Sequence, residues 1–310
     1  MTLDSGKASL STKSSGSRLQ TSVEVVKSGI QKGESKVRIH WNLIVATVVI
    51  SVLFLAPVPA SAQQKAGVSS ALPFGKPLPD LKGPAPKLPN GKPSMAGVWS
   101  QTRRADVTNP KVQAGFIKEL PYTPWGERQW KNYDTNKQGD YAGSCLPFGM
   151  SRTIFGPHPI EFVQDDNRLI ILAEQNTWFH QIYTDGRPHD PDLPSTWWGD
   201  SIGHYEGDTL IVETTNINGY IKVDTIGHPL SSKAKLTQTF KRPNYGTIQH
   251  TITYDDPKTY TKPWTITNTW SLEPIADTKL LEYSCEEGNI EYLSLGIIKL
   301  WHAPEGDDAP

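Results

Sequence analysis

Short runs in which apolar and polar residues alternate fill most of the chain after Cys145, and turn residues separate them. A period of two indicates a strand with one buried face, and many short strands in succession are typical of an antiparallel barrel or sandwich. The sequence therefore predicts a mainly β fold, an antiparallel meander that forms a calycin-like barrel or a curved sandwich. The predicted strands cover 160–164, 168–174, 177–183, 201–205, 209–215, 236–242, 248–254, 264–272 and 280–285.

One short helix is expected before these strands, from Pro124 to Tyr133. Thr123 can cap it, and a proline suits the first helical position because no hydrogen bond is lost there. The stretch 63–94 is rich in Pro, Gly and Lys and lacks either period, so we interpret it as a linker. A single β domain over 95–303 and a disordered tail over 304–310 complete the predicted organisation.

The last strands reveal which of their faces points inward. In 248–254 the even positions are apolar except His250, and in 264–272 they are apolar except Asn268, whereas the odd positions are Thr, Ser or Gln. Successive side chains of a strand point to opposite faces. Pairing Tyr254 with Trp264 therefore places His250 opposite Asn268 inside the sheet.

Two more polar residues extend this pair into a predicted row. A three-residue turn at 243–245 places Gln238 opposite His250, and one register of the following strand places Glu282 opposite Asn268. These two positions depend on the assumed registers, because a slip of one residue turns every side chain to the other face.

Four polar residues in one buried layer need partners, because buried polar groups are costly unless they bond to each other, to water or to a ligand. We interpret the row as the polar side of a pocket for a small organic molecule, with Trp264 and Trp270 in its apolar wall. The alternative is a closed hydrogen-bond network that only fixes the strand register.

The first 62 residues have the pattern of a signal sequence. An apolar run from Trp41 to Ala56 follows basic residues, and the small-residue sequence Ala60-Ser61-Ala62 precedes Gln63. An uncleaved membrane anchor is the alternative, but the run falls short of the usual length of a membrane span. We therefore expect a periplasmic or secreted protein with no stable membrane insertion after cleavage.

Export bears on the two cysteines, Cys145 and Cys285. In an oxidising compartment a pair of cysteines forms a disulfide more often than two free thiols. We predict that they are bridged; a reactive cysteine nucleophile is the alternative, and no neighbouring signature favours it.

Charge and motifs exclude several classes of function. After residue 62 the chain has 24 basic and 29 acidic residues, so it offers no basic surface to a nucleic acid. No H-E-x-x-H motif, Rossmann fingerprint or P-loop occurs. Gly199-Asp200-Ser201-Ile202-Gly203 has the G-x-S-x-G spacing, but it lies in an apparent strand and lacks the strand-to-helix turn of a hydrolase nucleophile elbow. We expect no metal and no cofactor, and the oligomeric state stays open.

Two loops offer further candidate ligand-binding residues. Arg187 and His189 follow an Asp-Gly turn and have side chains that can hold an anion at the mouth of a barrel. His204, Glu206 and Asp208 place an imidazole and two carboxylates within five residues. A plain turn with solvated charges is the alternative interpretation of the second group.

Motifs in a fixed order between residues 97 and 287 carry a resemblance. They are Cys145-Leu146-Pro147, Asp185-Gly186-Arg187-Pro188-His189, Gly199-Asp200-Ser201-Ile202-Gly203, Glu206-Gly207-Asp208-Thr209-Leu210, Asp255-Asp256-Pro257, Tyr260-Thr261-Lys262-Pro263-Trp264 and Glu282-Tyr283-Ser284-Cys285-Glu286-Glu287. In this combination the chain resembles a family of exported bacterial β proteins, whose members have Arg-Trp in place of His204-Tyr205. The resemblance implies a periplasmic location and transfers no catalytic residue, since the family has no established activity.

The sequence leaves three functions open. One is cofactor-independent acid–base catalysis by an isomerase, lyase or hydrolase, in which His250 carries the proton and Glu282 is a second acid or base. In that hypothesis Gln238 and Asn268 hold a carbonyl or hydroxyl group. The others are a carrier that binds a small molecule without chemistry and a structural protein of the cell envelope.

Overall fold

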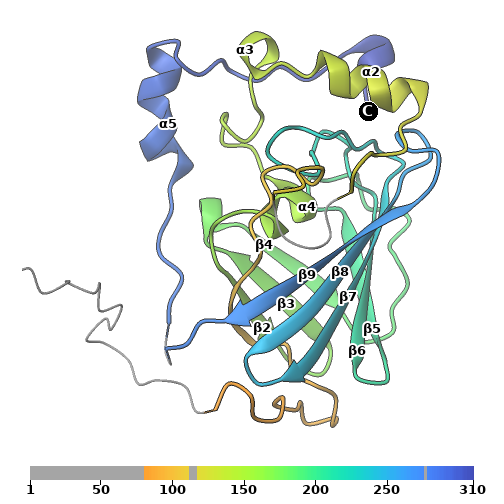
Figure 1. Cartoon of the computed structure of the whole chain (residues 1–310), viewed down its shortest axis with the longest axis vertical. Coiled ribbons are helices and arrows are strands. Elements are labelled where there is room, and N and C mark those ends of the chain that lie inside the picture. Colours follow the sequence, from red (N-terminus) through yellow and green to blue (C-terminus); the bar gives the residue numbers. More distant parts are fainter. Residues whose placement is uncertain (1–79, 112–116, 276–277) are drawn as a thin grey trace, which may run out of the picture. The chain divides into compact units, whose positions relative to one another are not determined.

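The computed structural model describes residues 80–111, 117–275 and 278–310 (Figure 1). The predicted signal sequence 1–62 and most of the predicted linker lie outside these ranges. No helix within them is long and apolar enough to cross a membrane.

Nine strands of the described chain form a closed barrel in sequence order, and β1 pairs with both β2 and β9 to close it. Neighbouring strands are antiparallel except β4 and β5, which are parallel and joined at the pair Tyr183 and Ile202. The predicted mainly β barrel is therefore confirmed, as a mixed one. The strands are β1 Gly97–Ser100, β2 Ile160–Gln164, β3 Arg168–Ala173, β4 Phe179–Tyr183, β5 Asp200–Glu206, β6 Thr209–Thr215, β7 Lys235–Asn244, β8 Thr247–Asp255 and β9 Trp264–Leu272.

The predicted strand over 280–285 is wrong. β1 occupies the second edge of β9, where Trp99 pairs with Leu272 and Ser100 with Ser271, so no edge is left for another strand. The chain instead leaves the barrel without regular structure and enters the helix α5, Cys285–Ser294.

The predicted helix is confirmed as α2, Pro124–Asn132, and the Thr123 hydroxyl accepts a hydrogen bond from the backbone N–H of Gly126 at 3.1 Å. The other helices are short. They are α3 Thr135–Gln138, α4 Gly149–Ile154, α5, and the 3₁₀ turns η2 Gln175–Thr177 and η3 Gly306–Asp308.

The barrel interior is a packed apolar core. Every residue of α4 is buried, and the inner positions of β7, β8 and β9 alternate with outer ones as the sequence predicts. Tyr254, Ile252 and Trp270 are fully buried.

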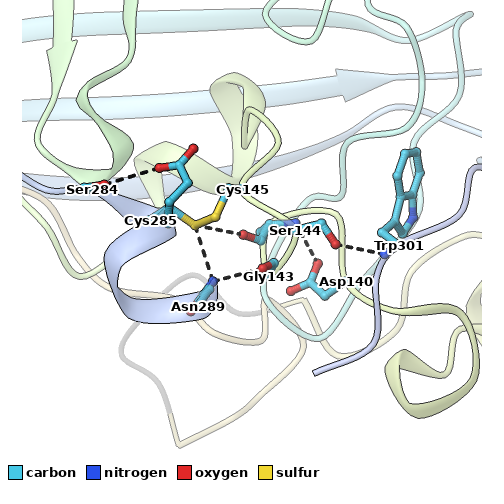
Figure 2. The surroundings of a disulfide bond; sticks show 10 residues. Asp140, Gly143, Ser144, Cys145, Ser284, Cys285, Asn289 and Trp301 are labelled. Carbon is cyan, nitrogen blue, oxygen red and sulfur yellow. Dashed lines mark hydrogen bonds between the residues drawn. A yellow bond between two sulfur atoms is a disulfide. The ribbon is translucent and has the colours of Figure 1, made fainter. Parts of the chain in front are cut away.

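The disulfide between Cys145 and Cys285 is confirmed, with the two Cα atoms 5.6 Å apart (Figure 2). It joins α5 to the segment before α4. The Asn289 side chain supports this junction by donating to the carbonyl of Gly143 at 2.9 Å. The chain beyond the barrel is therefore fixed covalently to it.

Candidate small-molecule site

Part of the predicted polar row exists inside the barrel. His250 pairs with Asn268, as predicted. Gln238 pairs with Ile252 rather than with His250, because the β7–β8 turn has two residues and a bulge precedes it. This shift of two residues keeps Gln238 on the inner face. Its Oε1 atom lies 3.0 Å from His250 Nε2.

The predicted position of Glu282 is wrong, because this residue lies outside the barrel in the exposed segment between β9 and α5. Its place beside Asn268 is taken by Arg104, whose side chain is 1% exposed. The guanidinium donates from Nε to Asn268 Oδ1 at 2.7 Å and from a terminal nitrogen to the Thr267 carbonyl at 3.1 Å.

These four side chains form a relay of hydrogen bonds. Burial lowers the pKa of His250 to about 3, so the imidazole is neutral at neutral pH. Its Nδ1 accepts from the Asn268 amide at 3.3 Å, which assigns the proton to Nε2 and makes that atom the donor to Gln238. Arg104 thus donates to Asn268, Asn268 to His250, and His250 to Gln238.

Aromatic rings fill the space around this relay. The rings of Phe240 and Trp270 lie with their centroids 4.8 and 4.7 Å from that of His250, and Trp264 stacks on Tyr254 at 4.2 Å. The packed rings favour an internal hydrogen-bond network over an open pocket, and the network ends at Gln238, whose buried Nε2 atom has no hydrogen-bond partner among the described residues.

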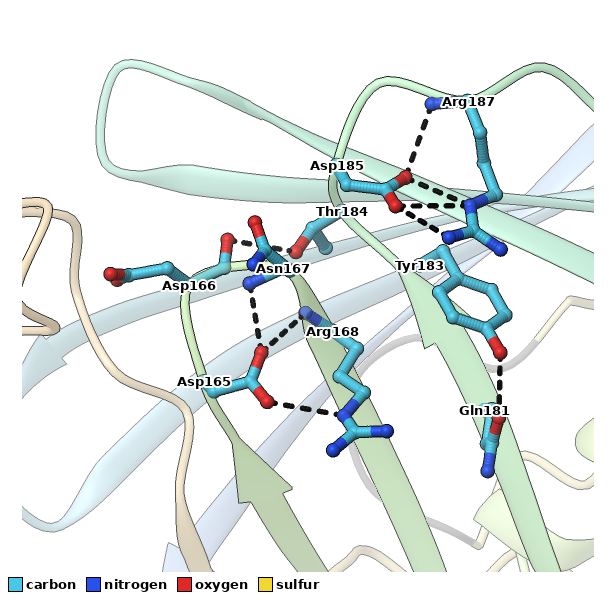
Figure 3. Close-up of polar contacts among 9 residues, drawn as sticks. All are labelled: Asp165, Asp166, Asn167, Arg168, Gln181, Tyr183, Thr184, Asp185 and Arg187. Carbon is cyan, nitrogen blue, oxygen red and sulfur yellow. Dashed lines mark hydrogen bonds and ion pairs between the residues drawn. The ribbon is translucent and has the colours of Figure 1, made fainter.

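The first candidate loop makes local contacts. Arg187 pairs with Asp185 at 2.6 Å, and its guanidinium lies 3.6 Å from the centroid of the Tyr183 ring (Figure 3). His189 Nδ1 lies 2.7 Å from an Asp200 carboxylate oxygen. Within the described chain, these contacts do not join the loop to the inner row.

The second candidate group sits on the exposed β5–β6 turn. His204, Glu206 and Asp208 are all exposed, and His204 Nε2 lies 3.4 Å from a Glu206 oxygen. This placement favours the solvated turn.

A partly enclosed cavity lies instead against α2, the connection between β6 and β7, and the C-terminal segment. It leaves about 70 Å³ in which the centre of a water molecule can lie, room for a few water molecules, and it is open to solvent on one side. Its lining residues include Trp125, Gln129 and Asn132 from α2, Tyr133 directly after it, Tyr220, Lys222 and Leu230 from the connection, and Trp301, His302 and Pro304 from the C-terminal segment.

Lys222 is the cationic residue of this lining. Burial lowers its pKa to about 8, against the opposing effect of the Asp140 carboxylate. Its Nζ atom lies 5.5 Å from the centroid of the Tyr133 ring, and within the described residues it has no hydrogen bond or ion pair. Asp140 is already bound by Arg152, which donates to both carboxylate oxygens at 2.8 Å. Lys222 therefore faces the cavity without a counterion.

A buried pair of side chains fixes the loop that carries Lys222. Both oxygens of Asp224 accept hydrogen bonds, from the backbone N–H groups of Val107, Gly227 and His228 and from His228 Nδ1 at 2.6 Å. The indole of Trp130 stacks on the His228 ring at 4.2 Å. The loop is thereby held against α2.

Gly227 brings the loop and α2 into direct contact. Its φ of +96° favours glycine, and a Cβ atom there would lie 2.0 Å from the Tyr133 ring. A side chain at this position would displace Tyr133 from the cavity wall.

A cluster of aromatic rings packs around the lining residues Tyr220 and Trp301. Trp197 contacts Tyr141, Tyr220 and Trp301 at centroid distances of 5.6, 6.0 and 5.9 Å. Tyr220 and Trp301 also meet each other edge to face at 5.5 Å. The cluster ties the C-terminal segment to the β6–β7 connection.

Hydrogen bonds hold the C-terminal segment, including residues 304–310, against the helices. The Trp301 backbone N–H donates to the Ser144 hydroxyl at 2.8 Å (Figure 2), and Trp125 Nε1 donates to the Asp307 carbonyl at 3.1 Å. Gly139 allows the close passage, since a Cβ there would lie 2.6 Å from the Lys299 carbonyl. The segment therefore forms one side of the cavity.

One group of side chains has the spacing of a metal site. Ligand atoms of Asp106, Asp224 and His228 all lie within 4.8 Å of one another. Because the Asp224 oxygens already accept hydrogen bonds from Val107 and from the loop, a cation would have to replace contacts that hold this loop. The donor set is better explained by loop closure.

Sequence reasoning missed Lys222 because the residues around it follow no period of a strand or helix. A local signal was present: an Asp followed three residues later by Gly and then His, in Asp224-Thr-Ile-Gly227-His228, is typical of a side-chain-closed turn.

No protein-family model matches this chain, and no curated protein matches it.

Proposed function

We propose that this barrel protein binds a small, partly apolar organic molecule in the cavity between α2, the β6–β7 connection and the C-terminal segment. The observation that carries the proposal is the Lys222 amine, which faces an aromatic-lined cavity without a counterion.

The energetic argument starts from the cost of this lysine. Removing an ammonium group from water is unfavourable unless a partner compensates it, and Asp140 is committed to Arg152. A residue that lowers stability without a structural partner is a candidate for function. The neighbouring indole and phenol rings supply the apolar surface that typical small-molecule sites have.

The closed relay around His250 supports a structural role for the barrel interior, so the proposed site lies at the end of the barrel. A carrier that binds a small molecule without chemistry, one of the functions that the sequence leaves open, is compatible with this proposal. A purely structural envelope protein is the competing function, and it predicts that no small molecule occupies the cavity.

A binding experiment tests the proposal. We expect saturation-transfer NMR to detect binding of at least one of benzoate, acetophenone and benzaldehyde to the full mature protein. Lys222→Met should weaken that binding about tenfold or more, because the polar anchor is lost. A wild-type protein that binds none of the three overturns the proposal.

Lys241→Met is the matched control, since Lys241 is exposed on β7. It should leave binding unchanged. Lys222→Met should fold at least as stably as the wild type, because methionine replaces a poorly solvated charge by an apolar chain of similar length. Equal loss of binding in both variants would contradict a role for this particular lysine.

We also propose that the protein is exported and matures near Gln63. The Cys145–Cys285 disulfide supports an oxidising compartment, and the pattern of residues 1–62 and the resemblance to exported β proteins agree with it. Intact-mass measurement of the protein from the periplasm of a bacterial host should give a chain without residues 1–62. A full-length product retained in the membrane would favour the anchor instead.

A further inference from the structure

We infer that Lys222 is a nucleophile that holds a small aldehyde or ketone as an imine in this cavity. The inference rests on the proposed function, since it needs the cavity to be the ligand site, and it names the chemical class of the ligand.

The geometry leaves the amine available. Some lysines of the described chain are bound to acceptors: Lys235 Nζ pairs with Glu213 at 2.6 Å, and Lys258 Nζ donates to the Ala309 carbonyl at 2.8 Å. The Lys222 amine contacts the face of the Tyr133 ring, and this face offers no lone pair to accept a hydrogen bond. Its lone pair, once deprotonated, points at no competing hydrogen-bond donor among the described residues.

Protonation also favours attack by this lysine. With a pKa of about 8, roughly a tenth of Lys222 is the free amine at pH 7, whereas an ordinary lysine has fewer than about one in a thousand. A desolvated lysine in an apolar pocket is the usual form of a Schiff-base nucleophile. The groups that face it are Tyr133, whose pKa burial raises so that it stays a neutral phenol, Asp140 with its Arg152 partner, and His302.

The chemical step is a condensation. The Nζ lone pair attacks the carbonyl carbon, a C–N bond forms, and the carbonyl oxygen takes a proton to give a carbinolamine. The hydroxyl group then takes a second proton from solvent, the C–O bond breaks as the nitrogen lone pair forms the C=N bond, water leaves, and the product is a protonated imine. No oxidant or reductant is needed, and hydrolysis by one water reverses the reaction.

The cavity wall suits this product. A protonated imine keeps one positive charge but has fewer N–H groups to solvate than an ammonium. The face of Tyr133 stabilises such a cation. The rings of Trp125, Tyr220 and Trp301 can pack on the organic part of the ligand.

Reductive trapping tests the inference. The mature wild-type protein is incubated with benzaldehyde, or with the smaller propionaldehyde, and treated with borohydride, and the modified lysine is identified by peptide mass spectrometry. We expect one main adduct, at Lys222, whose yield rises with pH through about 8. Lys222→Met should lose it, and Lys241→Met should retain it.

The outcomes separate this inference from the proposed function. Binding of benzaldehyde in saturation-transfer NMR with no trapped adduct overturns the covalent step and leaves the binding site standing. If none of benzoate, acetophenone and benzaldehyde binds and no adduct is trapped, both the proposed function and the covalent step are overturned. Equal labelling of Lys222 and the exposed lysines also overturns the inference, because it shows ordinary surface reactivity.

Discussion

Replacing both cysteines, Cys145→Ser with Cys285→Ser, is expected to lower the free energy of unfolding by about 4 to 5 kcal/mol. The disulfide closes a loop with a sequence separation of 140 residues, and the entropy that it removes from the unfolded chain grows with loop length. The measurement is urea unfolding followed by tryptophan fluorescence. An unfolding midpoint equal to that of the wild type would contradict the expectation.

Ser294→Ala is a suitable control, because Ser294 is exposed at the end of α5 and its hydroxyl bonds only within the helix, to the Glu291 carbonyl. It should change the unfolding free energy by less than about 0.5 kcal/mol. Dithiothreitol should reproduce the double substitution in the wild type and have no effect on the variant.

The same substitution also has a local consequence at the cavity. α5 precedes Trp301, and the disulfide fixes this stretch to the segment before α4 together with the Asn289–Gly143 and Trp301–Ser144 hydrogen bonds (Figure 2). Hydrogen exchange should therefore rise in residues 285–301 under conditions in which β6 to β9 stay protected. Uniform loss of protection would indicate that the disulfide supports the whole barrel equally.

Much of the barrel could be predicted because its strands alternate. The inner face of β8 and β9, and the pairing of His250 with Asn268, follow from the period of two alone. The register of Gln238 was wrong by two residues because the bulge before the β7–β8 turn leaves no mark in the pattern. A shift of two residues leaves Gln238 on the inner face, so its side chain still contacts His250 although the predicted register was wrong.

The error at the Glu282 end of the row arises because barrel closure depends on contacts between residues far apart in the sequence. The alternation in 280–285 suggested a strand for Glu282, but β1 had already taken the edge of β9. Arg104, which replaces it beside Asn268, comes from a loop 164 residues earlier in the chain. The environment of Lys222 could not be predicted for the same reason, because it forms only where α2 and the C-terminal segment meet the β6–β7 connection.

The second large effect is expected at the centre of the relay. Asn268→Leu should destabilise the barrel by about 3 to 5 kcal/mol, because it leaves the buried Arg104 guanidinium without one acceptor and His250 Nδ1 without its donor. Thr269→Val, on the exposed outer face of the same strand, should change the unfolding free energy by less than about 0.5 kcal/mol.

A double-mutant cycle shows whether the relay acts as a unit. Arg104→Met removes the buried charge that Asn268→Leu would strand, so the double variant should be more stable than the sum of the two losses implies, by more than about 1 kcal/mol. The measurement is urea unfolding of all four proteins at one pH above 5, where His250 is neutral in the fold because burial lowers its pKa to about 3. Additive losses would mean that Arg104 and Asn268 stabilise the barrel separately, and the closed network would then lose its support as the reason for these polar residues in the core.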